Sequence, residues 1–384
     1  MFTALSINIG ANHLTEESRG VKFMKRVMVT GAGGPASINF IASLKIAPEK
    51  IYVVGVDVNR FRIHLAPVDS RFVVPKATEE NYINVLNEIV RKESVDFIHA
   101  QPDIEVRVLS ENRDKLDAAV FLPSKEAIRI CQDKFETAKI LLKKGVPTAR
   151  AIEIMGEEDI VKAFEEFGRP VWIRAKRGAG GRGSTPAYNV ETAVSWIKYW
   201  RSRGGEMEFI AQEFLAGRNM AFHSLWKDGE LITSMARERI EYIYPDLAPS
   251  GVTGTPAVQR TIRNDEVNKI AVEAVLAIDP NFSGIACVDL KENSEGVPCV
   301  TEINAGRMFT TSFFFSYASK MLYGDYRANF PYLYLKIAYG EGIPQLPKFN
   351  ILPEELYWIR HIDAPPCLVR DDRVLGRMYD WKDI

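Results

Sequence analysis

The chain has 384 residues, of which 46% are hydrophobic and 26% charged, which is ordinary for a soluble globular protein with about two or three domains. Its formal net charge of −1 provides no global field that would recruit nucleic acid or an anionic membrane. The net charge therefore predicts no nucleic-acid partner. Because no run approaches the roughly 18 apolar residues of a membrane span, we also expect no membrane partner and a cytoplasmic location. The four cysteines form no C-x-x-C pair, which argues against structural zinc and against a disulfide scaffold.

A strand, a glycine turn and a helix are predicted at the start of the first domain. Residues 1–24 lack the basic-then-apolar pattern of a signal peptide, and we interpret them as an arm that is either disordered or an over-extended start. The run Lys25–Thr30 predicts a buried strand, Gly31–Pro35 a turn, and Ile51–Val56 a second strand, which together are typical of a doubly wound sheet. The glycines read G-x-G-G-P rather than G-x-G-x-x-G, which favours a structural turn over a dinucleotide site.

Two acidic residues follow the next predicted strand. The apolar run 95–100 leads almost directly into Asp103 and Glu105. Because open α/β sheets place ligands beyond the carboxyl ends of their strands, these acids could hold a substrate amine or hydroxyl. The alternative is a helix N-terminus, where acidic side chains are favourable.

A glycine-rich loop is predicted after two helices and the strand Pro170–Arg174. The second of those helices begins at Lys134, which on its own would be a solvated lysine. Four of the six residues from 178 to 183 are glycine, a composition that is unfavourable inside a helix or strand. Such a loop lets backbone amides approach phosphate oxygens, and positive charge there would come from Arg174, Lys176, Arg177 and Arg182. The alternative is a merely flexible hairpin tip.

Two arginines lie on the second strand of a predicted hairpin. The D-G pair at Asp228–Gly229 indicates the turn, and the strand after it continues to Arg237 and Arg239. Since they occupy alternate positions, these arginines share one face of the strand. They could clamp a substrate carboxylate or an acyl phosphate; the alternative is a pair of exposed arginines.

A second hairpin, Gly284–Arg307, carries two carboxylates and an amide. An apolar run reaches Asp289, a polar turn follows, and the return run places Glu302 and Asn304 two residues apart on one face. If the two runs pair antiparallel, Asp289 and Glu302 come side by side. This oxygen-only set suits Mg²⁺, and the alternative is ordinary surface acids.

Taken in order, these motifs resemble the ATP-grasp superfamily, and most closely its carbamoyl-phosphate-synthase-like branch. The matching motifs are D-x-K followed by E-I-N and an arginine, the glycine-rich loop, the hinge E-F-L-A-G, and the run S-x-E-A…D-K…G-V-P. The resemblance spans about Lys25 to about Gly340. It implies an α/β fold with α+β lobes, in which an N-terminal Rossmann-like pre-ATP-grasp domain precedes a two-lobed ATP-grasp fold. The expected ranges are 1–24 for the arm, 25–123 for the Rossmann-like domain, 124–206 for the small lobe, 207–345 for the large lobe and 346–384 for a C-terminal extension, irregular apart from one late strand.

The resemblance also implies roles for the site residues. The nucleotide would be bound by Lys134, Arg174, Gly180, Gly181, Gly183, Gln212, Glu213, Leu215 and Asn219, the last near the place where many relatives carry a ribose-binding acid. Mg²⁺, with Mn²⁺ as an alternative, would be bound by Asp289, Glu302 and Asn304. Catalytic roles would fall to Arg174, Asn304 and Arg307, although Arg307 comes one position later than is usual. Substrate contacts would come from Asp103, Glu105, Arg237 and Arg239.

The function implied is that of an ATP- and Mg²⁺-dependent ligase. It would activate a small-molecule carboxylate as an acyl phosphate and couple it to an amine, forming ADP and phosphate. The expected partners are these two substrates and, as in many relatives, a second copy of the chain in a homodimer. Two alternatives stay open: a kinase acting on a small molecule, carbamate or bicarbonate, and a non-catalytic nucleotide sensor, for which the missing ribose acid is the support.

Overall fold

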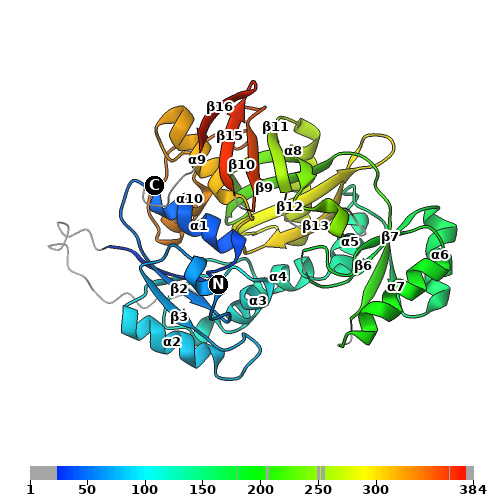
Figure 1. Ribbon diagram of the computed structural model, residues 1–384, viewed down its shortest axis with the longest axis horizontal. Coiled ribbons are helices and arrows are strands. Elements are labelled where there is room, and N and C mark those ends of the chain that lie inside the picture. Colours follow the sequence, from blue (N-terminus) through cyan, green and yellow to red (C-terminus); the bar gives the residue numbers. More distant parts are fainter. Residues whose placement is uncertain are drawn as a thin grey trace, which may run out of the picture.

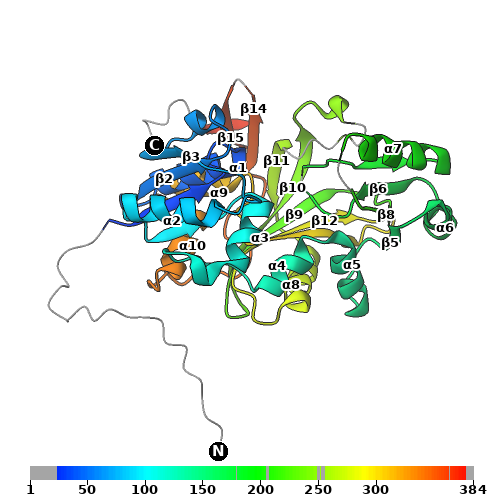
Figure 2. The same cartoon turned by 90° about the horizontal axis from the view of Figure 1, so that it is seen from below.

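The computed structural model describes residues 24–178, 180–204, 207–248, 251, 256–362 and 364–377, so almost the whole predicted N-terminal arm lies outside the described residues. The described chain contains three sheets (Figure 1). Figures 1 and 2 both place the first sheet at one end of the molecule, the smaller of the other two sheets at the opposite end, and the largest sheet between them. None of the helices in this part of the chain combines the length and apolar character that a membrane crossing requires.

The first sheet is parallel and has the strand order β3-β2-β1-β4. Its central strands are almost entirely buried because helices pack on both faces, as in a doubly wound sheet, so the predicted βαβ unit is confirmed. The strands are β1 Arg26–Thr30, β2 Tyr52–Asp57, β3 Ser70–Val73 and β4 Phe97–His99, and the helices are α1 Pro35–Lys45, α2 Tyr82–Glu93 and α3 Asp103–Glu111.

The small sheet is antiparallel and has the order β5-β8-β6-β7. Helices α6 and α7 bury its apolar face, and the glycine-rich loop joins β6 to β7. Strand β8 pairs within this sheet, although the expected range 207–345 would place it in the large lobe. The elements are β5 Ala151–Ile154, α6 Glu157–Phe167, β6 Val171–Ala175, β7 Thr185–Ala187, α7 Val190–Ser202 and β8 Phe209–Glu213.

The large sheet has eight antiparallel strands in the order β13-β12-β9-β10-β11-β14-β15-β16. Helices α4, α5 and α8 pack on one face, and α9, α10 and α1 cover part of the other. The strands are β9 Asn219–Lys227, β10 Glu230–Tyr242, β11 Pro256–Ile262, β12 Gly284–Glu292 and β13 Pro298–Ala305. The helices are α4 Lys125–Cys131, α5 Lys134–Lys143, α8 Asp265–Ile278, α9 Ser312–Tyr323 and α10 Phe330–Ala338.

The expectation of an irregular C-terminal extension is wrong beyond the late strand. Strand β14, Tyr357–His361, pairs with β11, and two further strands, β15 Ala364–Arg370 and β16 Arg373–Arg377, continue the large sheet. Trp358 and Leu368 are buried in the same core as α9 and α10. Burial of these apolar side chains favours regular pairing here despite the prolines of the segment.

Candidate active site

A cavity of 490 Å³ lies where the small sheet, the large sheet and the first domain meet. Its walls come from β6, the glycine-rich loop, the hinge between β8 and β9, strands β10, β12 and β13, and the segment before α9; Pro35 of α1 also reaches it. The predicted site residues outside its lining are Gly183, Asp103 and Glu105, and all the others line it.

The predicted metal ligands converge at one end of this cavity. The register of β12 and β13 places Asp289 directly opposite Glu302, as the hairpin prediction requires. Asn304 follows on the same face, and its Nδ2 donates to Asp289 Oδ2 and to Glu302 Oε1 over 3.5 Å each. The expectation that these three side chains meet is confirmed.

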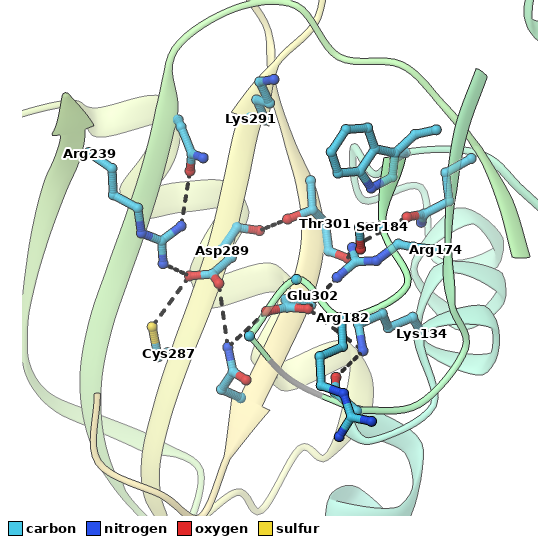
Figure 3. A pocket seen from close by; sticks show the side chains of 18 of the residues that line it. Lys134, Arg174, Arg182, Ser184, Arg239, Cys287, Asp289, Lys291, Thr301 and Glu302 are labelled. Carbon is cyan, nitrogen blue, oxygen red and sulfur yellow. Dashed lines mark hydrogen bonds and ion pairs between the residues drawn. The ribbon is translucent and has the colours of Figure 1, made fainter. Parts of the chain in front are cut away.

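Cations already neutralise both carboxylates. Arg239 Nη2 lies 2.5 Å from Asp289 Oδ1, and Arg174 Nη2 lies 2.6 Å from Glu302 Oε2. Lys134 Nζ is 3.8 Å from the same Glu302 oxygen. Figure 3 shows these cations approaching the carboxylates from opposite sides, Arg239 from β10 on one side, and Arg174 from β6 and Lys134 from α5 on the other.

Burial and charge act differently on the two carboxyl groups. Burial raises the pKa of Asp289, and the charge of Glu302 adds to this effect while Arg239 opposes it. Burial also disfavours the Glu302 carboxylate, but Arg174 and Lys134 outweigh it and hold the pKa of Glu302 well below its usual range. Burial lowers the pKa of Lys134 to about 8, although Glu302 partly offsets the effect. Glu302 is therefore the more firmly ionised member of the pair.

The donor atoms fit Mg²⁺. They are carboxylate and amide oxygens, and the nearby Cys287 thiol is buried with a raised pKa, so it does not provide a thiolate for a softer metal. Within the described ranges, no group of three or more His, Cys, Asp or Glu side chains could hold a metal. Two carboxylates form only part of a coordination shell, which suits Mg²⁺ because it keeps several waters and commonly binds substrate phosphates.

The glycine-rich loop lies over the cavity beside Lys134. Gly180, Gly181 and Gly183 have φ angles of +71°, +71° and +73°, which residues with a Cβ rarely adopt. Trp196 Nε1 of α7 donates to the carbonyl of Gly183 over 2.9 Å, and Lys134 Nζ of α5 donates to the carbonyl of Gly178 over 2.7 Å. These bonds fix the two ends of the loop.

The four cations predicted around the loop divide into two pairs. Arg174 and Arg182 line the cavity. Lys176 and Arg177 do not, because both form ion pairs with acidic side chains, those of Asp133, Glu153 and Glu208. Their positions therefore do not support the prediction that Lys176 and Arg177 surround a triphosphate.

The hinge forms the opposite end of the cavity. Glu213 ends β8 and accepts a hydrogen bond from Arg150 Nε over 3.0 Å, and Leu215 is buried behind it. Lys291 lies 5.2 Å above the ring of Phe214, and both residues line the cavity. Lys291 was not among the predicted site residues, yet it follows Asp289 by two positions, and alternation along a strand places both on one face.

Asn219 is held by protein partners at both ends of its amide. Its Nδ2 donates to the hydroxyl of Tyr242 over 2.8 Å, and its Oδ1 accepts from Arg239 Nη1 over 2.9 Å. Arg218, which precedes it, forms an ion pair with Glu292 at 2.6 Å. Contact between Asn219 and a ribose stays a prediction.

The two acids of α3 have different surroundings. Asp103 Oδ1 lies 2.5 Å from Arg307 Nε, and Arg307 also donates to Asn304 Oδ1, so Asp103 positions an arginine that lines the cavity. Glu105 is buried within the first domain, where burial raises its pKa to about 7 and Tyr82 lies nearby. The expected contact between Glu105 and substrate is therefore not supported by its position.

Several lining residues were not predicted from the sequence. They come mostly from the segment before α9 and from the strands beside the carboxylates, and they include Met308, Phe309, Thr310, Tyr242, Cys287 and Lys291. Cys287 and Lys291 alternate with Asp289 along one strand, and Lys291 is also the lysine of the D-x-K motif.

Comparison with known proteins gives two family matches and several relatives. Residues 131–311 match the ATP-grasp domain, and residues 27–121 match the PylC-like N-terminal domain. The chain is 26% identical over 200 residues to phosphoribosylamine–glycine ligase of Lactococcus lactis, which covers 50% of this chain and 48% of that protein. It is also 26% identical over 186 residues to biotin carboxylase 1 of Bacillus subtilis, covering 46% and 40%. The chain thus spans about half the length of the curated relatives it matches.

Solved structures match over more of the chain. The L-amino acid ligase of Bacillus licheniformis has a TM-score of 0.65 at 16% identity, covering 88% of this chain and 79% of that one. Carboxyaminoimidazole ribonucleotide synthase of Aspergillus clavatus, complexed with ATP, has a TM-score of 0.63 at 16% identity, covering 88% and 81%. At these identities the likeness shows the fold alone, and it confirms the predicted fold class.

Proposed function

Because this chain belongs to the ATP-grasp superfamily, we propose that it is an ATP- and Mg²⁺-dependent ligase that joins a small-molecule carboxylate to an amine. The products other than the amide are ADP and phosphate. The observation that carries the proposal is the facing pair Asp289 and Glu302, which lies in the same cavity as the glycine-rich loop and the hinge. A cavity that holds all three elements suits a nucleotide with its phosphates directed at a metal.

The proposed division of roles follows the geometry. Adenine would lie at the hinge beside Leu215 and Lys291, and the phosphates would lie under Gly180 and Gly181. Asp289, Glu302 and Asn304 would hold Mg²⁺, which when bound neutralises charge on the phosphates. The Mn²⁺ alternative is compatible with the same oxygen ligands.

Charge stabilisation by fixed cations would support the transfer itself. A carboxylate oxygen of the substrate attacks the γ-phosphorus of ATP, the bond to the β–γ bridging oxygen breaks, and ADP leaves. The amine nitrogen then attacks the acyl carbon, phosphate leaves with its oxygen, and the proton of the amine passes to solvent. Arg174, Lys134 and Arg307 lie around the carboxylate pair, where negative charge builds up.

No side-chain nucleophile is required by this scheme. Among the described residues, the only thiol that lines the cavity is that of Cys287, and burial, reinforced by the nearby Asp289, raises its pKa. Positioning of the two substrates and charge stabilisation are sufficient for phosphoryl and acyl transfer.

The test is ATP turnover with Mg²⁺ in the presence of a pool of small acids and amines, with ADP and free phosphate both measured. A ligase releases ADP and phosphate in equal amounts, and only when an acid and an amine are both present. ADP without free phosphate would identify a kinase. Tight binding of Mg²⁺-ATP with no turnover in any combination would favour the sensor, whose support is the absence of an acid at Arg218–Asn219.

A further inference from the structure

A polar band continues along the large sheet beyond the carboxylate pair. Arg237 precedes Arg239 by two positions on β10, so both share one face. Gln259 of β11 lies directly opposite Arg239, and Trp358 of β14 lies directly opposite Gln259. Arg360 follows Trp358 by two positions on the same strand.

Several buried polar atoms of this band lack hydrogen-bond partners in the described part of the chain. Among the described residues, no partner exists for Arg237 Nη1, Arg360 Nη2, Trp358 Nε1, or either the oxygen or the nitrogen of the Gln259 amide. Arg237, Gln259 and Trp358 are only 2%, 0% and 1% exposed, so water does not replace those partners freely. Buried polar groups in folded proteins are nearly always satisfied, and a cluster that is not indicates a missing ligand.

The positive charges of Arg237 and Arg360 also lack a negatively charged partner in the described part of the chain. Arg237 Nε donates to His223 Nε2 over 2.6 Å, and burial holds the pKa of that histidine well below its usual range, so the histidine is neutral. Arg360 Nε donates to the carbonyl of Pro256 over 2.8 Å. Neither arginine has a carboxylate partner among the described residues. Burial lowers the pKa of Arg237 to about 9, and the neighbouring charges of Arg239 and Arg360 add to the effect.

The start of α9 adds two further unpartnered groups. The hydroxyls of Thr311 and Ser312 are buried and lack partners in the described chain. Phe314, in the first turn of α9, stacks on Trp358 with ring centroids 5.4 Å apart, which places this helix end against the same strand. The helix N-terminus adds the partial positive charge of its free amides.

We propose that this band, defined by Arg237, Gln259, Trp358 and Arg360, binds a second carboxylate of the acid substrate, one that does not react. The inference rests on the proposed function, because it assigns the reacting carboxylate to the end of the cavity near Asp289. The substrate is then a dicarboxylic acid. Its distal carboxylate accepts from the two guanidinium groups, and the Gln259 amide bonds a polar group beside it.

The position of the band sets the span of the substrate. Arg237 lies two strands away from Asp289 in the order β12-β9-β10, which corresponds to roughly 10 Å between backbones. Phe309 lines the cavity and stacks on His223, which itself bonds Arg237, so an apolar wall lies beside this route. An acid with a short hydrocarbon chain between two carboxylates suits these surroundings.

The experiment compares diacids with monoacids of equal carbon number by calorimetry, in the presence of Mg²⁺-ADP. The pairs are succinate with butyrate, glutarate with pentanoate, and adipate with hexanoate. We expect at least one diacid to bind at least tenfold more tightly than its monoacid. The variant Arg237→Gln should remove that preference, whereas Arg129→Gln, which changes an exposed arginine of α4, should retain it. Equal binding within all three pairs, or binding of none of the acids, overturns the proposal.

A second variant keeps the proposal testable if Arg237→Gln fails to fold. Gln259→Glu places a carboxylate beside the unpaired guanidinium groups, so we expect a higher melting temperature without ligand and loss of the diacid preference. A lower melting temperature with an intact preference overturns the proposal. The shift in melting temperature that Mg²⁺-ADP causes separates the subsite proposal from the proposed function. If Mg²⁺-ADP raises the melting temperature but diacids are not preferred, only the subsite proposal fails. If Mg²⁺-ADP causes no shift, the proposed function fails.

Discussion

Arg239 and Asp289 form an ion pair 2.5 Å long between strands that are not neighbours in the large sheet, since β9 lies between β10 and β12. On β9, Asn219 lies opposite Arg239 and Ala221 lies opposite Asp289, so the arginine side chain crosses β9 diagonally, past the small side chain of Ala221. A carboxylate proposed to bind Mg²⁺ is thus held by an arginine whose own position is fixed by Asn219. The ion pair orients the Asp289 carboxylate and opposes the rise in its pKa that burial causes.

The first prediction concerns the stability that this pair provides. Arg239→Met should lower the free energy of unfolding by about 3 kcal/mol, because it leaves the Asp289 carboxylate, whose side chain is only 14% exposed, without its cation. The double variant Arg239→Met/Asp289→Asn should recover most of that loss, since an amide carries no charge to be compensated. Urea unfolding of the native protein, Arg239→Met, Asp289→Asn and the double variant measures the coupling energy between the two side chains. If the two single effects simply add, the ion pair contributes nothing to stability.

The second prediction tests the metal assignment. Glu302→Gln should reduce ATP turnover by about 10²-fold or more, because the neutral amide binds Mg²⁺ poorly and no longer balances Arg174 and Lys134. Binding of ADP without metal should change little, since the hinge contacts are untouched. Glu295→Gln, an exposed change in the turn of the same hairpin, is the matched control and should leave turnover unchanged. Retained turnover in Glu302→Gln would refute the role of this carboxylate.

The positions of Asp289, Glu302 and Asn304 could be predicted from the sequence because they depend on local rules. Alternation along a strand and a short polar turn place these three side chains together without any knowledge of the rest of the sheet. The glycine-rich loop is equally local, since its composition excludes helix and strand. Both features therefore lie where the sequence indicates.

The polar band and the environment of Glu105 could not be predicted, because both depend on contacts distant in the sequence. Pairing of Arg239 with Asp289 requires the strand order around β9, and the band requires β14 to pair with β11. A strand pattern gives the face that a residue shares but not the neighbouring strand. Glu105 lies in the first turn of α3, as its charge suggests, but packing within the first domain buries it away from the cavity.

The third prediction concerns the loop that would cover the phosphates. Gly180 has a φ of +71° and open space where a Cβ would lie, and Gly204 has a φ of +95° with equally open space but lies outside the cavity. Gly180→Ala and Gly204→Ala should therefore cost a similar amount of stability, about 1 kcal/mol each. Only Gly180→Ala should raise the KM for ATP, by about tenfold, because the added strain shifts the amides that would bind the phosphates. Equal KM values for the two variants would contradict the role of the loop.

The fourth prediction concerns the pH dependence that Lys134 confers. Burial lowers its pKa to about 8, so the free enzyme loses this positive charge as the pH rises through that value. Because the protonated amine is the form that would contact the phosphates, kcat/KM for ATP should be constant below about pH 7 and fall by about tenfold for each further unit above pH 8.

Two variants separate Lys134 from other groups that titrate in the same range. Lys134→Arg, which keeps its charge to much higher pH, should retain part of the activity and lose the alkaline fall. Lys134→Met should be slow at every pH, with no fall near pH 8. An alkaline fall that persists unchanged in both variants would assign it to another group. If kcat/KM falls above pH 8 in the native protein but not in Lys134→Arg, the group that titrates is Lys134 and its charge acts on the nucleotide. The hydrogen bond from Lys134 to the glycine-rich loop places the amine where such an effect arises.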